Sequence, residues 1–75
     1  MKILTLRFRH PVYGQAKFFR ANNGHLGKNI KVTSDKNNEV KISLKDLAVG
    51  AYRLIFEWEH DGKSFSINRD VVIQA

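Results

Sequence analysis

The last third of the chain predicts a long β-hairpin. Residues 51–60 alternate between apolar and polar side chains, and the apolar ones are Tyr52, Leu54, Phe56 and Trp58. Successive side chains of a strand point to opposite faces, so this alternation predicts a strand with one buried side. Asp61-Gly62 follows, and both residues can adopt the positive φ that a type I′ turn requires. We therefore expect the chain to fold back at Asp61-Gly62 into a second strand.

A two-residue loop fixes the pairing of this hairpin. It places His60 opposite Lys63, and the pairs that follow are Trp58 with Phe65, Phe56 with Ile67, Tyr52 with Val71 and Arg53 with Asp70. Each such aromatic or opposite-charge pair contributes about 0.2–1 kcal/mol. Arg69 falls in phase with the apolar residues, opposite Leu54. Two resolutions are open: a bulge near Asn68-Arg69, or an arginine stem along the edge of the core.

The segment before the hairpin has the pattern of a corner in a Greek-key sandwich. Leu44 and Leu47 precede Gly50 and Tyr52. In such sandwiches a tyrosine at this place often bonds to upstream backbone, which is the tyrosine corner. The alternative is a core aromatic with its hydroxyl at the rim. In both cases we expect Tyr52 to be structural.

The rest of the chain predicts four more strands, at residues 2–9, 16–21, 28–33 and 39–44. Pro11 interrupts the first strand, and Gly14 is expected to turn the chain. Phe18 and Phe19 face opposite ways, and we expect one to cover a sheet edge. Residues 22–27 and 34–38 are expected loops, and residues 43–47 fit a short helical turn. The predicted fold is one all-β domain over residues 1–75, a small antiparallel immunoglobulin-like β-sandwich of six to seven strands.

Composition restricts the possible functions but does not identify one. The chain has 75 residues, no cysteine, and no apolar run long enough to cross a bilayer. Its net charge of +6 raises the prior for an anionic partner. The basic residues are scattered, so a solvated outer face is the simpler interpretation. The surface we predict for a partner comprises Lys2, Arg7, Arg9, Lys17, Phe19 and Arg20.

The sequence contains no recognisable catalytic or metal-binding pattern. His10, His25 and His60 are not spaced as a chelating pair, and they could meet only if their strand ends coincide. Glu57 and Glu59 share a strand face without a nearby nucleophile, so solvated glutamates are expected. We therefore predict a non-enzymatic domain without a metal or cofactor.

The pattern from Gly14 to Ile73 resembles the FixH/CcoH-like domain, and the resemblance covers about residues 3–73. The matching positions are Gly14, Phe19, Arg20, Leu47, Gly50, Tyr52, Trp58, Gly62, Lys63 and Phe65. Two features depart from the family: its N-terminal transmembrane helix is not in this chain, and Ala21 stands where the family usually has proline. The motifs are moderately specific, because Leu-x-x-Gly-x-Tyr also occurs in other sandwiches.

The resemblance implies an extracytoplasmic accessory domain that works in the assembly of a membrane haem–copper cytochrome oxidase. It also implies protein partners, namely subunits of that membrane complex, and a periplasmic location for an excised ectodomain. The alternative drawn from composition is a basic β-domain that binds nucleic acid or another anionic partner, with Phe18 or Phe19 as a stacking platform.

Overall fold

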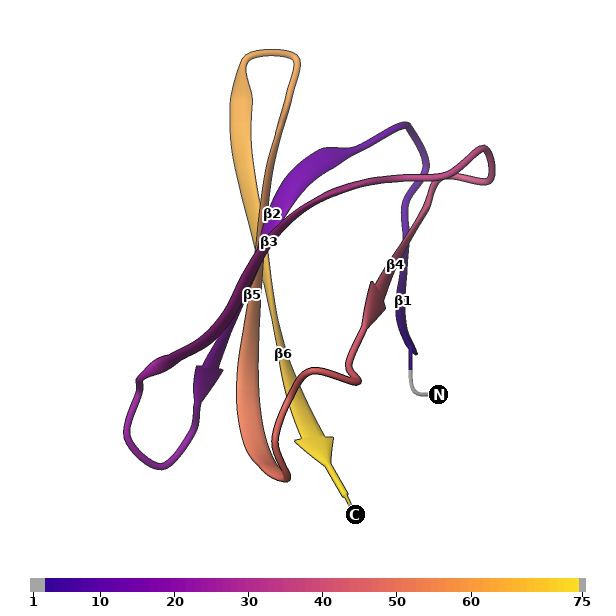
Figure 1. Cartoon of the computed structure of the whole chain (residues 1–75). Coiled ribbons are helices and arrows are strands. Elements are labelled where there is room, and N and C mark those ends of the chain that lie inside the picture. The colour runs from indigo at the N-terminus through magenta and orange to yellow at the C-terminus, as the bar shows by residue number, and fades with distance from the viewer. Residues whose placement is uncertain (1–2, 75) are drawn as a thin grey trace.

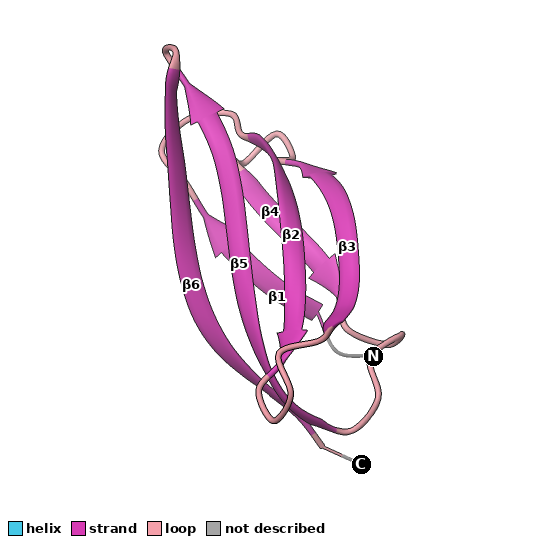
Figure 2. Ribbon diagram, turned by 90° about the vertical axis from the view of Figure 1, so that its left-hand side faces the viewer, coloured by secondary structure: helices cyan, strands magenta, loops and turns pink. Residues whose placement is uncertain are grey.

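The computed structural model describes residues 3–74 and arranges them as six strands in two antiparallel sheets (Figure 1). The strands are β1 (Ile3–Arg7), β2 (Tyr13–Arg20), β3 (Leu26–Thr33), β4 (Glu39–Ser43), β5 (Gly50–His60) and β6 (Lys63–Ile73). One sheet pairs β1 with β4, and the other has the order β3-β2-β5-β6. In Figure 2, β1 and β4 lie behind the larger sheet. The predicted fold class, an all-β antiparallel sandwich, is confirmed.

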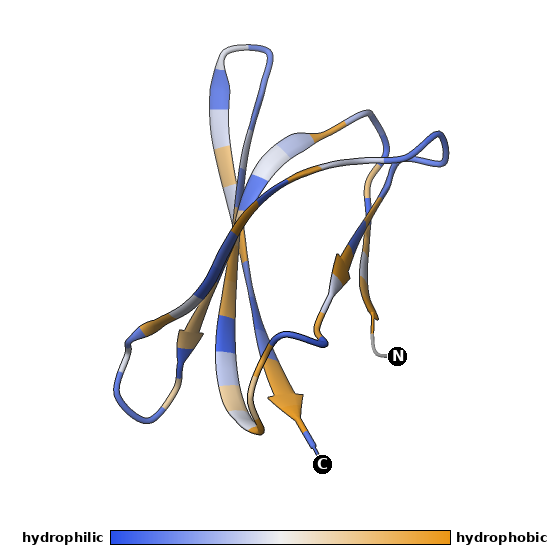
Figure 3. Ribbon diagram, in the orientation of Figure 1, coloured by the Kyte–Doolittle hydropathy of each residue, from blue (hydrophilic) through white to orange (hydrophobic). Residues whose placement is uncertain are grey.

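The core lies between the two sheets. We call the side of the four-stranded sheet that packs on β1 and β4 its inner face, and the opposite side its outer face. Leu6 and Ile42 of the smaller sheet are buried with Phe18, Leu54 and Phe56 of the larger one. Each fully buried side chain of this size stabilises the fold by roughly 1.5–3 kcal/mol relative to exposure. Apolar positions accordingly recur along both sheets (Figure 3).

The hairpin has the predicted turn and pairing. Asp61 and Gly62 have φ values of 53° and 75°, as a type I′ turn requires. The observed pairs include Trp58 with Phe65, Phe56 with Ile67, Tyr52 with Val71 and Arg53 with Asp70. The bulge considered near Arg69 is absent, because the β5–β6 register runs without a shift. Arg69 instead stays in phase with the core and is exposed, since β6 is an edge strand whose side chains can reach water.

The tyrosine corner is also confirmed. The Tyr52 hydroxyl donates to the Ala48 carbonyl at 2.8 Å, and the ring is buried. The expected helical turn at residues 43–47 is wrong. The Leu47 N–H donates to the Leu44 carbonyl at 3.1 Å, which closes a single tight turn that no helix continues.

Two expectations that concern β2 are wrong. Gly14 does not turn the chain but lies inside β2. A Cβ there would collide with the Glu57 carbonyl oxygen and lie 2.8 Å from the Phe56 ring. Glycine therefore permits a close approach between β2 and β5. Because β2 is an interior strand, neither phenylalanine covers an edge: Phe18 is in the core and Phe19 is on the outer face.

The predicted loop at residues 22–27 is shorter than expected. Leu26 and Gly27 already belong to β3, and the β2–β3 register shifts between Phe18 and Phe19. A Cβ at Gly27 would lie 3.2 Å from the Tyr52 ring, so this residue also allows a close approach. The loop proper is closed by two hydrogen bonds, from Gly24 N–H to the Arg20 carbonyl and from Arg20 N–H to the His25 carbonyl.

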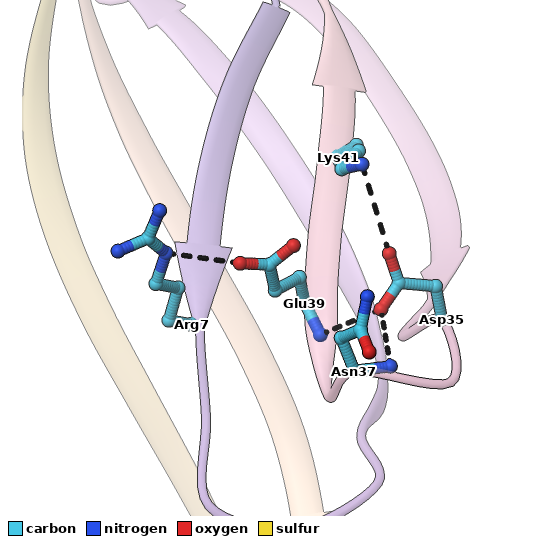
Figure 4. Close-up of polar contacts among 5 residues, drawn as sticks. All are labelled: Arg7, Asp35, Asn37, Glu39 and Lys41. Carbon is cyan, nitrogen blue, oxygen red and sulfur yellow. Dashed lines mark hydrogen bonds and ion pairs between the residues drawn. The ribbon is translucent and has the colours of Figure 1, made fainter.

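The turn between β3 and β4 is organised by Asp35 (Figure 4). One carboxylate oxygen accepts from the N–H of Asn37 at 2.8 Å and of Glu39 at 3.1 Å, and Lys41 lies 3.8 Å from the other. The Glu39 and Asn37 N–H groups, with a further contribution from Lys41, lower the pKa of Asp35 below its ordinary value of 3.8. The negative charge of Asp35 is therefore part of the turn.

Candidate interaction surface

The outer face of the four-stranded sheet has no other strand of residues 3–74 packed on it (Figure 2). Its central side chains come from β2 and β5, and they are Tyr13, Gln15, Lys17, Phe19, Arg53, Ile55, Glu57 and Glu59. These residues face outward because the residues that alternate with them, such as Ala16, Phe18 and Phe56, are buried on the inner face. The face presents an array of polar and apolar side chains.

The first of two hollows on this face lies near the hairpin end of the sheet. Its volume is about 420 Å³, and its lining includes Tyr13, Gln15, Lys31, Glu57, Glu59 and Ser64. Tyr13 is 63% exposed. Gln15 is held by donating to the Asn29 side chain at 2.6 Å, and Glu57 by an ion pair with Lys17 at 3.1 Å. The hollow therefore offers an accessible aromatic ring beside fixed polar groups.

The second hollow lies at the other end of the sheet, against the β2–β3 loop. Its volume is about 260 Å³, and it is lined by Phe19, Arg20, Ala21, Gly24, Arg53 and Asp70. Arg53 lies 3.6 Å from the Asp70 carboxylate, and the Arg20 guanidinium lies 5.4 Å from the centre of the Tyr52 ring. Phe19 and Arg53 therefore face this hollow from the outer side, whereas the guanidinium of Arg20 lies over the Tyr52 ring on the inner side.

The charges of the outer face balance. Its cations are Lys17, Lys31 and Arg53, and its anions are Glu57, Glu59 and Asp70. The net charge of +6 is therefore located elsewhere on the chain. Proteins that bind nucleic acid do so largely by neutralising phosphates with lysine and arginine. A neutral face does not supply that interaction, whereas protein surfaces commonly mix both signs.

The structure brings together only part of the predicted partner surface. Lys17 and Phe19 lie on the outer face, and Arg20 lines the second hollow. Arg7 lies on β1 and forms an ion pair with Glu39 at 3.0 Å. Arg9 lies in the β1–β2 loop, and Lys2 falls outside the described residues. The predicted surface does not include Tyr13 or Lys31, and Tyr13 falls in the segment of Pro11 and Gly14 where a turn was expected.

Most residues that carried the family resemblance have structural roles. Gly50 and Gly62 have φ values of 146° and 75°, which favour glycine. Leu47 is buried in the corner beside Tyr52. These positions shape a sandwich of this kind whatever it binds, so they support the fold more than a function.

The aromatic end of the hairpin is partly open. The Trp58 ring stacks on Phe56 and Phe65 at centroid distances of 5.5 and 5.6 Å, and Phe8 meets it edge-on at 5.0 Å. Phe65 remains 41% exposed. The Trp58 indole N–H is buried and has no acceptor among the described residues.

Two histidines meet at the hairpin tip, which sequence reasoning did not predict. The rings of His10 and His60 stack with centroids 3.8 Å apart and planes 11° from parallel, and His60 lies 3.4 Å from Asp61. His25 lies in the β2–β3 loop. Residues 3–74 contain no group of three metal-ligating side chains. The contact between His10 and His60 could not be predicted, because residue spacing does not define the path of the β1–β2 loop.

Comparisons of the chain with protein-family models, curated proteins and solved structures found no match. Within residues 3–74 no helix is long and apolar enough to span a membrane. The functional argument therefore depends on the residues and contacts described above.

Proposed function

We propose that this chain is a non-enzymatic protein-interaction domain that binds its partner through the outer face of the four-stranded sheet. The observation that carries the proposal is the uncovered, charge-balanced outer face with its two hollows. Four strands of eight to eleven residues at their usual spacing give a flat area of roughly 600 Å², without counting the protruding side chains. The protruding side chains increase the accessible area of the face toward the roughly 800 Å² that one partner contributes to a standard interface.

The composition of the face fits this role. Protein interfaces combine aromatic anchors with a polar, solvated rim. Tyr13 and Phe19 supply one aromatic ring at each hollow, and half-buried Ile55 lies between them on β5. Glu57 and Glu59 lie on the open surface of the sheet. The ion pair of Glu57 with Lys17 is more typical of a residue that contacts a partner than of a general acid or base in catalysis.

The biological setting we propose follows from the sequence resemblance to FixH/CcoH-like domains. In that setting the domain lies outside the cytoplasm, and its partners are subunits or assembly factors of a haem–copper cytochrome oxidase. The support for this setting is the residue pattern from Gly14 to Phe65, together with a surface suited to protein contacts.

Site-specific photo-cross-linking in the native host tests the proposed function. A photoreactive residue replaces Lys17 or Phe19 on the outer face, and in matched controls it replaces Thr5 or Lys41 on the smaller sheet. We expect discrete protein adducts from the outer-face positions and none from the controls. In the proposed setting those adducts contain oxidase subunits or assembly factors.

The same experiment separates the anionic alternative. Nucleic-acid adducts, or equal protein labelling from Thr5 and Lys17, would contradict the proposed surface. Nucleic-acid binding would also weaken steeply with added salt, because each neutralised phosphate releases counterions. The affinity for a protein partner that binds the neutral outer face is expected to change little over the same range of salt concentration.

A further inference from the structure

The free edge of β6 is long and regular. β6 has eleven residues, no proline and an unbroken register with β5. In a two-residue type I′ hairpin, the flanking residues His60 and Lys63 form a hydrogen-bonded pair, and such pairs recur at every second residue. The backbone groups of Ser64, Ser66, Asn68, Asp70 and Val72 therefore point away from β5. None of them bonds to another described segment through its backbone.

The opposite edge of the same sheet is protected. The β2–β3 pairing contains a register shift, and β3 lies against β4. Lys28 of β3 donates to the Ser43 carbonyl at 2.8 Å and lies 3.5 Å from Asp46, which ties that edge to the smaller sheet. Native proteins usually block a free edge with a bulge, a proline, a covering segment or charged side chains that point inward. On β6 the described structure offers only charged side chains, chiefly Arg69.

We propose that β6 is a strand-addition site for an extended, acidic segment of a partner protein. On the inner side of β6, Phe65 is 41% exposed, Ile67 is half-buried and Arg69 is exposed. Arg69 forms no ion pair within residues 3–74. An added strand satisfies the free backbone groups and places its alternate side chains beside these three residues. The inference rests on the proposed function in that the partner is a protein.

A second copy of this chain does not fit the site. The inner side of β6 carries Lys63 and Arg69 and no carboxylate. Two β6 strands paired edge to edge with their inner sides aligned would place four cations on one strip, and like charges on adjacent strands are destabilising. Arg69 therefore disfavours pairing of β6 with a second copy of β6 and favours pairing with an acidic strand.

The geometry defines the sequence of an antiparallel partner. Read from its N-terminus, the added strand passes Arg69, then Ile67, then Phe65. A segment with the pattern acidic-x-apolar-x-apolar places a carboxylate beside the guanidinium and apolar side chains beside the other two. A peptide with a Glu-Ser-Val-Thr-Phe centre is the corresponding probe, and replacing its glutamate with lysine gives the control peptide.

Binding of these peptides to the 75-residue chain tests the inference. Trp58 is the only tryptophan and stacks on Phe65, so its fluorescence reports binding at this strip. We expect the acidic peptide to bind more tightly, and Arg69→Glu to weaken it about five-fold, as an exposed ion pair implies. Arg69→Glu should then prefer the lysine peptide. If Arg69→Glu still bound the acidic peptide more tightly than the lysine peptide, the proposal would be overturned.

A backbone variant tests the strand geometry separately. Asn68→Pro removes an N–H that faces the free edge and breaks no bond to β5, so the hairpin tolerates it. We expect Asn68→Pro to lose peptide binding and Asn68→Ala to retain it, with both folded by circular dichroism. Equal binding by the two variants would count against strand addition. Displacement of the acidic peptide by a thymidine oligonucleotide would likewise show general charge attraction and overturn the inference.

The failure of this inference can be told from failure of the proposed function. Protein cross-links from Lys17 without peptide binding at β6 would remove only the strand-addition site. Peptide binding at β6 without cross-links from Lys17 would instead move the interaction from the outer face to the edge.

Discussion

The hydroxyl of Tyr52 joins the corner of the fold to β5. It donates to the Ala48 carbonyl, four residues upstream, while the ring is 2% exposed. We predict that Tyr52→Phe lowers the free energy of unfolding by about 0.5–1.5 kcal/mol, because it removes one hydrogen bond and keeps the packing. Urea denaturation measures the change. Tyr13→Phe on the exposed outer face is the matched control and should stay within about 0.5 kcal/mol.

The indole of Trp58 contributes by packing and not by its N–H. We predict that Trp58→Ala lowers the free energy of unfolding by about 3–5 kcal/mol, because it leaves a void against Phe8, Phe56 and Phe65. Trp58→Phe should cost less than about 1.5 kcal/mol, because it also removes a buried donor that has no acceptor. Equal losses from the two variants would show that the indole N–H is bonded.

Within the elements, Gly14 determines how closely β2 approaches β5. A methyl group there meets the Glu57 carbonyl oxygen and the Phe56 ring, neither of which can move without disturbing the sheet. We predict that Gly14→Ala lowers the free energy of unfolding by about 1–3 kcal/mol through overpacking. Thermal melting followed by circular dichroism measures it. A variant as stable as the parent chain would show that the two strands separate easily.

The Asp35 turn gives a stability term that depends on pH. Because the folded state lowers the pKa of Asp35, its charge stabilises the fold above the ordinary value of 3.8, and this term is lost as the pH falls through the folded-state pKa. We predict that the stability difference between the parent chain and Asp35→Asn narrows as the pH falls below 3.8. Denaturant titrations across this range check it. A difference independent of pH would mean that only the acceptor geometry matters.

The hairpin could be predicted from the sequence because its information is local. Alternation, the Asp61-Gly62 turn and cross-strand pairing fixed each contact of β5 with β6, and the Leu44 to Tyr52 spacing identified the corner. Gly14 was misjudged because its role depends on Glu57, which is distant in the sequence. Phe19 was misjudged because strand order, and thus which strands form edges, does not follow from alternation alone.

The candidate surface was less predictable for the same physical reason. Charge count identified Lys17 and Arg20 but grouped them with Arg7 and Arg9, which the fold places elsewhere. Which cations have a carboxylate partner depends on register between strands. Only the assembled sheet shows that the outer face is neutral and that the excess charge lies away from it.

At the scale of the whole molecule, the two sheets differ in width. A two-stranded sheet covers the inner face of a four-stranded one, and the β3 side is tied to β4 while β6 remains a free edge. The outer face and the β6 edge adjoin each other. A partner could engage both, with side chains on the outer face and a strand along the edge.

Amide mapping by NMR tests the central claim most directly. The partner recovered by cross-linking is purified and added to the isotope-labelled chain. We predict amide shift changes on the outer-face residues of β2 and β5, from Tyr13 to Phe19 and from Arg53 to Glu59, with β1 and β4 unchanged. Shift changes centred on β1, β4 and Arg9, reproduced by an oligonucleotide and abolished by moderate salt, would contradict the account.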